Sequence, residues 1–304
     1  MTFTTLAPTN SSNLKGLSIL LTGGASGLGL STATFLAQSG AIVTITDIQD
    51  GSAIAADLTA QGHIVQYVHC DITNWESQVS AFKAALEFSP NKTLDAVAAF
   101  AGVDNTGHLV DFIAANDVSL NGPPPPIPDL TPIEVNLKGT FYTAALALHY
   151  LRLPSPSSPK SKSLTIVTSL AGYIDDTHST CYTASKYGSR GLFRGIRAQC
   201  HSQFNIRVNA ICPWAMKTPM IEGALQRMAD FGILPSKGLS LVPHDVITSA
   251  VGRVVGDEGI QGRAIAIVPE GAVDLGDDIE GAYGGPKLVE LMALRREAGD
   301  FLHS

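Results

Sequence analysis

The sequence is poor in cysteine and in charged residues, and it lacks any long uninterrupted apolar run. Its cysteines show no paired spacing of the kind that zinc sites and redox motifs use; they are Cys70, Cys181, Cys200 and Cys212. We therefore expect reduced thiols in a cytoplasmic protein that holds no metal ion. No apolar stretch reaches about 20 residues, the length that a membrane-spanning helix needs. These absences exclude a disulfide scaffold and a membrane-spanning protein.

Clusters of basic residues are also missing. The chain has 20 Lys and Arg against 27 Asp and Glu, a formal net charge of −7, whereas a nucleic-acid-binding surface needs grouped Lys and Arg. Residues 1–13 lack the basic start and the apolar run of a signal peptide. With 45% hydrophobic and 15% charged residues, the composition predicts a compact protein that binds neither nucleic acid nor a membrane.

Short apolar runs alternate with longer helical patterns along most of the chain. Most of the apolar runs are nearly continuous, as expected for parallel strands that helices cover on both faces. The expected strands span residues 17–21, 41–46, 64–69, 94–100, 164–169, 206–211 and 264–268. The expected helices span residues 27–39, 74–87, 132–152, 182–202 and 243–255. This order predicts an α/β, Rossmann-like, doubly wound sheet of seven parallel strands with right-handed crossovers.

Two proline-rich stretches interrupt this alternation, at residues 122–128 and 153–163. Both fall between expected elements, and neither separates two self-sufficient cores, so we interpret them as surface loops. The sequence therefore predicts a single domain over residues 14–270. A short tail at 1–13 precedes it, and residues 271–304 extend the same domain.

A glycine-rich turn follows the first expected strand. Residues 22–29 read TGGASGLG, and a helix is expected to begin near Gly27. Glycine lets the backbone turn tightly and lets the helix N-terminus approach a diphosphate, whose charge the free N–H groups favour. A glycine cluster alone is weak evidence, but its position between a strand and a helix strengthens it. The turn predicts a dinucleotide-binding site.

Two carboxylates follow the next strands. Asp47 ends the second expected strand, where a carboxylate accepts hydrogen bonds from ribose hydroxyls and repels a 2′-phosphate. No Lys or Arg lies among residues 22–29, so we predict NAD as the cofactor in preference to NADP. The alternative is that Asp47 caps a helix over residues 51–61. Asp71, after the third strand, either bonds the adenine amino group or serves as a turn residue.

A second group of polar residues predicts proton transfer. Tyr182 and Lys186 lie four residues apart in an expected helix and hence on one face. An ammonium group beside a phenol favours the phenolate and lowers the phenol pKa; the alternative is a solvated helix face. Ser169 ends the fifth expected strand, at the edge where open α/β sheets bind ligands. Asn136 lies within an expected helix, where Asn is locally unfavourable, and this favours a functional role.

These motifs together resemble the short-chain dehydrogenase/reductase family, of the NAD-dependent type. The resemblance covers about residues 14–270 and rests on the glycine turn, Asn136, Ser169 and the Tyr182-x-x-x-Lys186 pair. It implies that Tyr182 exchanges a proton with the alcohol and that Lys186 lowers the tyrosine pKa and bonds the nicotinamide ribose. It also implies that Ser169 orients the substrate oxygen and that Asn136 holds a water for proton relay.

The resemblance assigns further positions to the two ligands. The residues expected to bind NAD are Gly23, Ser26, Gly27, Leu28, Gly29, Asp47, Asp71, Ile72, Ala101, Gly102, Tyr182, Lys186, Pro213 and Thr218. The residues expected to bind the substrate are Ser169, Tyr173, Ile174, Tyr182, Trp214 and Met220.

The chain departs from the family pattern at two places. Residues 99–102 read Ala-Phe-Ala-Gly where the family usually has Asn-Asn-Ala-Gly, which puts the local sheet bonding in doubt. Trp214 follows Pro213 where the family usually has glycine; it either reshapes the cleft or packs beneath a lid. The region 214–242 is apolar and rich in Met, and in the family it forms a flap over the substrate; the alternative is ordinary amphipathic packing.

We therefore expect an NAD-dependent oxidoreductase that converts a secondary alcohol to a ketone, or the reverse. Because Met adapts to irregular shapes, the flap favours a bulky, apolar polyketide, terpenoid or steroid-like substrate of secondary metabolism. The alternatives are a non-redox isomerase, cyclase or dehydratase that uses the same residues, and a non-catalytic NAD(H)-sensing module. The resemblance also implies a homodimer or homotetramer.

Overall fold

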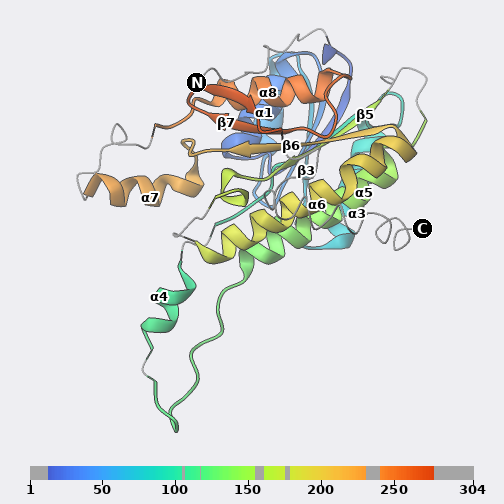
Figure 1. Ribbon diagram of the computed structural model, residues 1–304. Coiled ribbons are helices and arrows are strands. Elements are labelled where there is room, and N and C mark those ends of the chain that lie inside the picture. The colour runs from blue at the N-terminus through green and yellow to red at the C-terminus, as the bar shows by residue number, and fades with distance from the viewer. Residues whose placement is uncertain are drawn as a thin grey trace, which may run out of the picture.

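The computed structural model describes residues 13–104, 107–116, 118–154, 161–174, 179–230 and 240–276, which form one layered α/β fold (Figure 1). Their strands build one sheet in the order β3-β2-β1-β4-β5-β6-β7-β8. The strands are β1 (Ser18–Thr22), β2 (Ile42–Asp47), β3 (Ile64–His69), β4 (Ala96–Ala99), β5 (Lys162–Val167), β6 (Ile206–Pro213), β7 (Ala264–Val268) and β8 (Gly271–Asp274). The strand order reverses between β1 and β4, which is where open α/β sheets bind ligands.

The predicted doubly wound α/β sheet is confirmed, but the sheet has one strand more than predicted. Strands β1 to β7 are parallel, and β8 pairs antiparallel with β7, with Val268 opposite Gly271. Gly271 has φ +123°, a conformation that glycine adopts readily, and the chain reverses there within two residues. A four-residue strand beginning at glycine has no periodicity that the sequence could reveal.

Helices cover both faces of the sheet. One face packs against α1 (Gly27–Gln38), α2 (Ser52–Ala60) and α8 (His244–Gly256). The other face packs against α3 (Trp75–Phe88), α5 (Thr140–Tyr150) and α6 (Thr180–Phe204). Helices on both faces explain why the strands are nearly continuous apolar runs.

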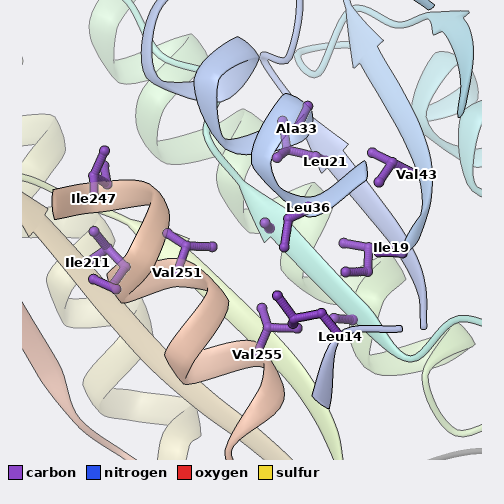
Figure 2. Close-up of a cluster of buried hydrophobic side chains, with 14 of the residues drawn as sticks. Leu14, Ile19, Leu21, Ala33, Leu36, Val43, Ile211, Ile247, Val251 and Val255 are labelled. Atoms are coloured by element: carbon purple, nitrogen blue, oxygen red, sulfur yellow. The ribbon is translucent and has the colours of Figure 1, made fainter. Parts of the chain in front are cut away.

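The core beneath α1 and α8 holds these two helices side by side. Figure 2 shows Leu21 of β1, Leu36 of α1 and Val251 of α8 in one buried cluster. Ile247, Val251 and Val255 recur every four residues, so they form one apolar stripe along α8. This packing anchors α8 beside α1, the helix that follows the glycine turn.

The segment 132–152, predicted as one α-helix, is divided. Its first part is a π-helix, η2 (Ile133–Gly139), and α5 continues from it. At the junction Gly139 lies so close to Ile72 that an added Cβ would be 2.7 Å from Ile72 Cδ1. Further elements that the sequence did not predict are α4 (Leu109–Ala114), α7 (Pro219–Asp230) and the short 3₁₀ helix η3 (Leu170–Gly172).

The proline-rich stretch 122–128 is an exposed loop, as predicted. The loop predicted for 153–163 is shorter, because β5 begins at Lys162, and residues 155–160 lie outside the described residues. Of the predicted tail only residue 13 is described, and of the predicted extension only 271–276. Among the described helices, none is both long enough and apolar enough to cross a bilayer.

Candidate active site

The glycine turn between β1 and α1 is held by contacts that only glycine permits. Gly23 has φ +70°, and a Cβ there would lie 2.6 Å from the Cα of Ala101. A Cβ on Gly29 would lie 2.0 Å from the carbonyl oxygen of Gly23. Both distances are far below a normal carbon contact, so the turn is tightly closed and lies against Phe100 and Ala101, directly after β4.

The N-terminus of α1 fits an anionic ligand. Ser26 occupies the N-cap position, but its side chain forms no capping hydrogen bond to the helix. The first N–H groups of a helix have no partner within it, and together with the helix dipole they favour a phosphate group. Gly27, whose φ is +51°, lies against the Thr218 side chain, and Leu28 follows it in the first turn. The predicted contacts from Ser26, Gly27, Leu28 and Thr218 are therefore gathered at one helix end.

Asp47, which is predicted to bind the ribose hydroxyls, also accepts hydrogen bonds from the backbone around it. It ends β2 with only 7% of its surface exposed, and its two oxygens accept hydrogen bonds from the N–H groups of Ala25 and Gln49, each at 2.9 Å. The bond from Ala25 ties the carboxylate to the glycine turn. The alternative that Asp47 caps the next helix is wrong, because the N-cap of α2 is Gly51.

Asp71 and Ile72 support the loop after β3. One oxygen of Asp71 accepts hydrogen bonds from the N–H and the hydroxyl of Thr73, both at 2.8 Å, which is the turn role kept open above. Ile72 is buried and packs against Gly139. Its side chain faces the protein, so a contact between Ile72 and a cofactor would have to come from the backbone.

Asn136 lies at the centre of the π-helix η2 and is buried. Its Oδ1 accepts a hydrogen bond from the N–H of Val103 at 2.7 Å. Its Nδ2 donates to the carbonyl of Val103 at 2.8 Å and to Ser185 Oγ at 3.0 Å. Asn136 thus links the loop after β4 to α6, one residue before Lys186. These bonds support this loop, together with the bond from the Ala101 N–H to Thr22 Oγ1 at 3.4 Å.

Tyr182 and Lys186 come together on α6. The Lys186 Nζ lies 5.4 Å from the centre of the Tyr182 ring and donates a hydrogen bond to the carbonyl of Val167 at 3.3 Å. Lys186 is buried, and burial lowers its pKa to about 8. A buried ammonium acts on a nearby phenol more strongly than a solvated one, because little water screens it. The alternative of a solvated helix face is wrong for Lys186.

Ser169 lies two residues beyond the end of β5, at the same sheet edge as Val167. Its Oγ accepts a hydrogen bond from the N–H of Ala171 at 3.1 Å and donates to the carbonyl of Pro213 at 3.4 Å. The hydroxyl therefore caps η3 and joins the loops that follow β5 and β6. The bonding of Ser169 to Pro213 brings two of the predicted site residues into contact.

Arg190 is a site residue that the sequence did not reveal. Its guanidinium carbon lies 3.8 Å from the centre of the Tyr173 ring, and its Nη1 donates to the carbonyl of Gly172 at 3.1 Å. Arg190 follows Lys186 by four residues and therefore shares its face of α6. This four-residue spacing from Lys186 is the sequence feature that could have indicated Arg190 as a site residue. Arg190 holds the turn that carries Tyr173, a predicted substrate contact.

The predicted substrate contacts differ in their exposure. The Trp214 side chain packs against the core beneath α8, so the packing interpretation is favoured; its backbone N–H donates to the carbonyl of Ile267. Ile174 and Met220 are exposed, at 44% and 43%. Residues 231–239 of the predicted flap lie outside the described residues, so a cover over the substrate stays a prediction.

His244 is a second residue that the sequence did not reveal. Its Nδ1 lies 2.6 Å from Ser31 Oγ on α1, and its Nε2 lies 2.7 Å from the carbonyl of Lys217. A carbonyl only accepts, so Nε2 carries the proton and Nδ1 accepts from the serine in the neutral ring. His244 thus fastens the segment containing Thr218 to the helix of the glycine turn. A lone histidine at a helix start offers no sequence signal for this.

Comparison with known proteins agrees with this geometry. The family model of short chain dehydrogenases matches residues 18–229. A relative from Dothistroma septosporum, named 5'-hydroxyaverantin dehydrogenase, is 45% identical over 94% of this chain and 95% of its own length. A relative from Cochliobolus lunatus, named NADP-dependent dehydrogenase clz5, is 34% identical over 66% of this chain and 71% of its own. The crystal structure of gox2181 has the same fold, with a TM-score of 0.68 at 24% identity over 84% of this chain and 95% of that chain.

The buried ammonium predicts a stability cost that depends on pH. The pKa of Lys186 falls from 10.5 to about 8 on folding, so between these values the unfolded chain binds more protons. The unfolding free energy of the wild type should therefore rise as pH increases through this window. Lys186→Met should lack that rise and should be more stable by about 1–2 kcal/mol at pH 7. Urea unfolding of the wild type and of Lys186→Met at several pH values measures the rise with pH and the difference in stability at pH 7.

The matched control is Lys138→Met, because Lys138 lies on the surface beside Glu134. That variant should keep the rise between pH 8 and 10.5. Equal pH profiles for the wild type and Lys186→Met would contradict the burial argument.

His244 predicts a loss of cofactor affinity without a loss of chemistry. His244→Phe removes both ring hydrogen bonds at similar volume, so the cofactor dissociation constant should rise about 30-fold, as expected for two bonds of about 1 kcal/mol each. The kcat at saturating cofactor should change little. His244→Gln should recover part of the affinity, since its amide can donate to Lys217.

The surface variant His201→Phe serves as the control for calorimetric binding. If His244→Phe lowers the melting temperature but leaves cofactor affinity and KM unchanged, His244 has only a structural role.

Proposed function

The chain belongs to the short-chain dehydrogenase/reductase family, and from that premise we propose that it oxidises a bulky, apolar secondary alcohol to a ketone with NAD as acceptor. The observation that carries the proposal is the buried Lys186 ammonium beside Tyr182. An inert nucleotide-binding module would gain nothing from this placement. Keeping an ammonium buried costs stability, and burial outweighs the attraction of Asp104 in setting the Lys186 pKa, so the placement favours catalysis.

The residues of the turn fit a nicotinamide dinucleotide. Gly23 and Gly29 leave no room for a side chain, and the start of α1 offers N–H groups to the diphosphate. Asp47 receives the adenosine ribose, and Thr218 lies beside Gly27, where it can reach the diphosphate region. When bound, NAD supplies the acceptor for the hydride.

The residues of the chain handle the proton. Tyr182 accepts the proton of the alcohol as the carbon–oxygen double bond forms, and it returns the proton in the reverse direction. The Lys186 ammonium stabilises the phenolate form of Tyr182, which is the base that accepts this proton. Ser169 orients the substrate oxygen toward the tyrosine. The amide hydrogens of Asn136 are already used by Val103 and Ser185, so we assign its side chain to positioning and its backbone to the proposed water.

The substrate class rests on two supports. The Dothistroma septosporum relative is named for 5'-hydroxyaverantin, and it matches this chain over nearly its whole length, so we propose that compound or a close analogue as the alcohol. The exposed apolar side chains of Ile174 and Met220 near the site suit such a ligand. Turnover of small polar polyols with no apolar substrate accepted would contradict this part of the proposal.

Tyr182→Phe tests the chemistry. The variant keeps the ring but has no hydroxyl, so kcat should fall by about 10²–10⁴-fold, as expected for losing a general acid–base group. NAD binding, followed by calorimetry, should persist. The assay is NADH absorbance with a panel of apolar secondary alcohols.

The matched control is Tyr187→Phe on the exposed face of the same helix, which should keep activity. Product formation by the wild type without any change in NADH would favour a non-redox isomerase, cyclase or dehydratase. Binding of NAD without any turnover would favour the sensing module.

Asp47→Asn tests the cofactor preference. The change removes the charge that repels a 2′-phosphate and leaves an oxygen that can still accept from Ala25. The ratio of NADP to NAD affinity should rise about tenfold, a difference of roughly 1.4 kcal/mol. Asp50→Asn, on the exposed turn that follows, should leave the ratio unchanged. Tighter binding of NADP than of NAD by the wild type would contradict the assignment of NAD as the preferred cofactor.

A further inference from the structure

The loop after β4 contacts α6 on both sides of Tyr182. Near the beginning of this loop, an added Cβ on Gly102 would lie 3.6 Å from Lys186 Nζ. Farther along, the carbonyl of Gly107 accepts a hydrogen bond from the N–H of Thr180 at 3.2 Å. Tyr182 lies between Thr180 and Lys186 on α6. The two contacts therefore bring the loop to the Tyr182–Lys186 pair.

Asp104 lies in this loop, and its position is set by the residue before it. The side chain of Asn136 accepts a hydrogen bond from the Val103 N–H at 2.7 Å and donates to the Val103 carbonyl at 2.8 Å. Two residues span at most about 7 Å of chain, so Asp104 stays close to Gly102 and hence to Lys186. Asp104 is only partly exposed. Water therefore screens its charge less than it would on an open surface.

The charge of Asp104 reaches residues next to Tyr182. Burial lowers the pKa of Lys186 to about 8, and the nearby Cys212 and Asp104 oppose this lowering. Burial raises the pKa of the Cys181 thiol, and the Asp104 carboxylate adds to this rise. Cys181 adjoins Tyr182 in the chain, and Lys186 Nζ lies 5.4 Å from the centre of the Tyr182 ring. The same negative charge therefore acts on the Tyr182 phenol.

The other groups around Lys186 differ from Asp104 in charge or in orientation. Cys212 of β6 contributes a fully buried thiol, and Asn136 of η2 contributes a neutral amide. Arg190 of α6 directs its guanidinium to the backbone of η3. Among the residues that the structure describes, Asp104 is the carboxylate whose charge acts on Lys186.

We propose that Asp104 is a third ionisable group of the active site, and that its carboxylate sets the pH range in which the Tyr182–Lys186 pair works. A negative charge beside the pair favours the ammonium and disfavours the phenolate. Lys186 therefore keeps its proton up to a higher pH, and Tyr182 loses its proton at a higher pH. Asp104 acts through these two residues, so it is a positioning residue. The proposal rests on the proposed function, in which the Tyr182 phenolate accepts the proton of the alcohol.

Asp104→Asn tests the proposal through the pH profile of kcat/KM for oxidation of an apolar secondary alcohol with NAD. In the proposed mechanism the acid limb reports the Tyr182 proton, and the alkaline limb reports the Lys186 proton. Loss of one negative charge lowers both pKa values, so the whole bell-shaped profile should move to lower pH by about 0.5–1 unit. Asp104→Glu restores the charge and should move the profile back toward that of the wild type.

The matched control is Asp111→Asn, which removes the same charge from the exposed surface of α4. This variant should keep the pH profile of the wild type. A lower kcat/KM in Asp104→Asn at every pH, without a shift of the profile, would show a structural role alone and overturn the proposal. An equal shift in Asp111→Asn would also overturn it.

Urea unfolding gives a second readout that needs no turnover. The unfolding free energy of the wild type should rise with pH from the folded-state pKa of Lys186, about 8. Asp104→Asn lowers that pKa further, so its rise should begin about 0.5–1 pH unit earlier. The double variant Asp104→Asn, Lys186→Met should lack the rise.

The unfolding experiment separates this proposal from the proposed function. A rise that begins at the same pH in Asp104→Asn and in the wild type would overturn the role of Asp104. A wild type that oxidises no alcohol, together with the earlier rise in Asp104→Asn, would overturn the proposed function and support the action of Asp104 on Lys186.

Discussion

The burial of the Lys186 ammonium is the constraint on which the rest of the site depends. The group lies in a place where burial alone lowers its pKa, and the surrounding backbone keeps it there. The carbonyl of Val167 accepts a hydrogen bond from the ammonium, and Gly172 packs so closely on α6 that an added Cβ would lie 2.9 Å from the Lys186 carbonyl oxygen. The π-helix then brings Asn136 to Ser185, next to the lysine. Three segments thus meet around one charge.

In the half of the site that is expected to hold the cofactor, the backbone of the glycine turn lies very close to the backbone after β4. Gly23, Gly29 and Ala101 meet at distances that exclude side chains. His244 then connects α1 to the segment of Thr218, so the turn, the helix and the loop after β6 form one bonded unit. The two halves adjoin where Gly102 lies beside Asn136 and Lys186.

Much of this arrangement could be predicted from the sequence, because the relevant signals are local. Continuous apolar runs predict parallel strands that helices cover on both faces. The glycines of the turn lie within eight consecutive residues, and Tyr182 and Lys186 lie four residues apart on one helix. Residues that act across elements left no such signal. His244 bonds residues 27 and 213 positions away in the chain. The π-helix η2 likewise coincides with tertiary contacts, namely the hydrogen bonds of Asn136 and the close approach of Gly139 to Ile72, which local propensity does not contain.

The two hydrogen bonds of Asp47 have an evolutionary consequence. Two relatives of this chain are named NADP-dependent dehydrogenases. Here the carboxylate that we propose selects NAD also accepts a hydrogen bond from the N–H of Ala25 and so supports the glycine turn. A lineage that exchanged this residue for a basic one would lose an acceptor at the same moment as it gained a new specificity. A change from NAD to NADP preference at this position therefore needs a second substitution that supplies a new acceptor for the Ala25 N–H. A single mutation of Asp47 would weaken the turn.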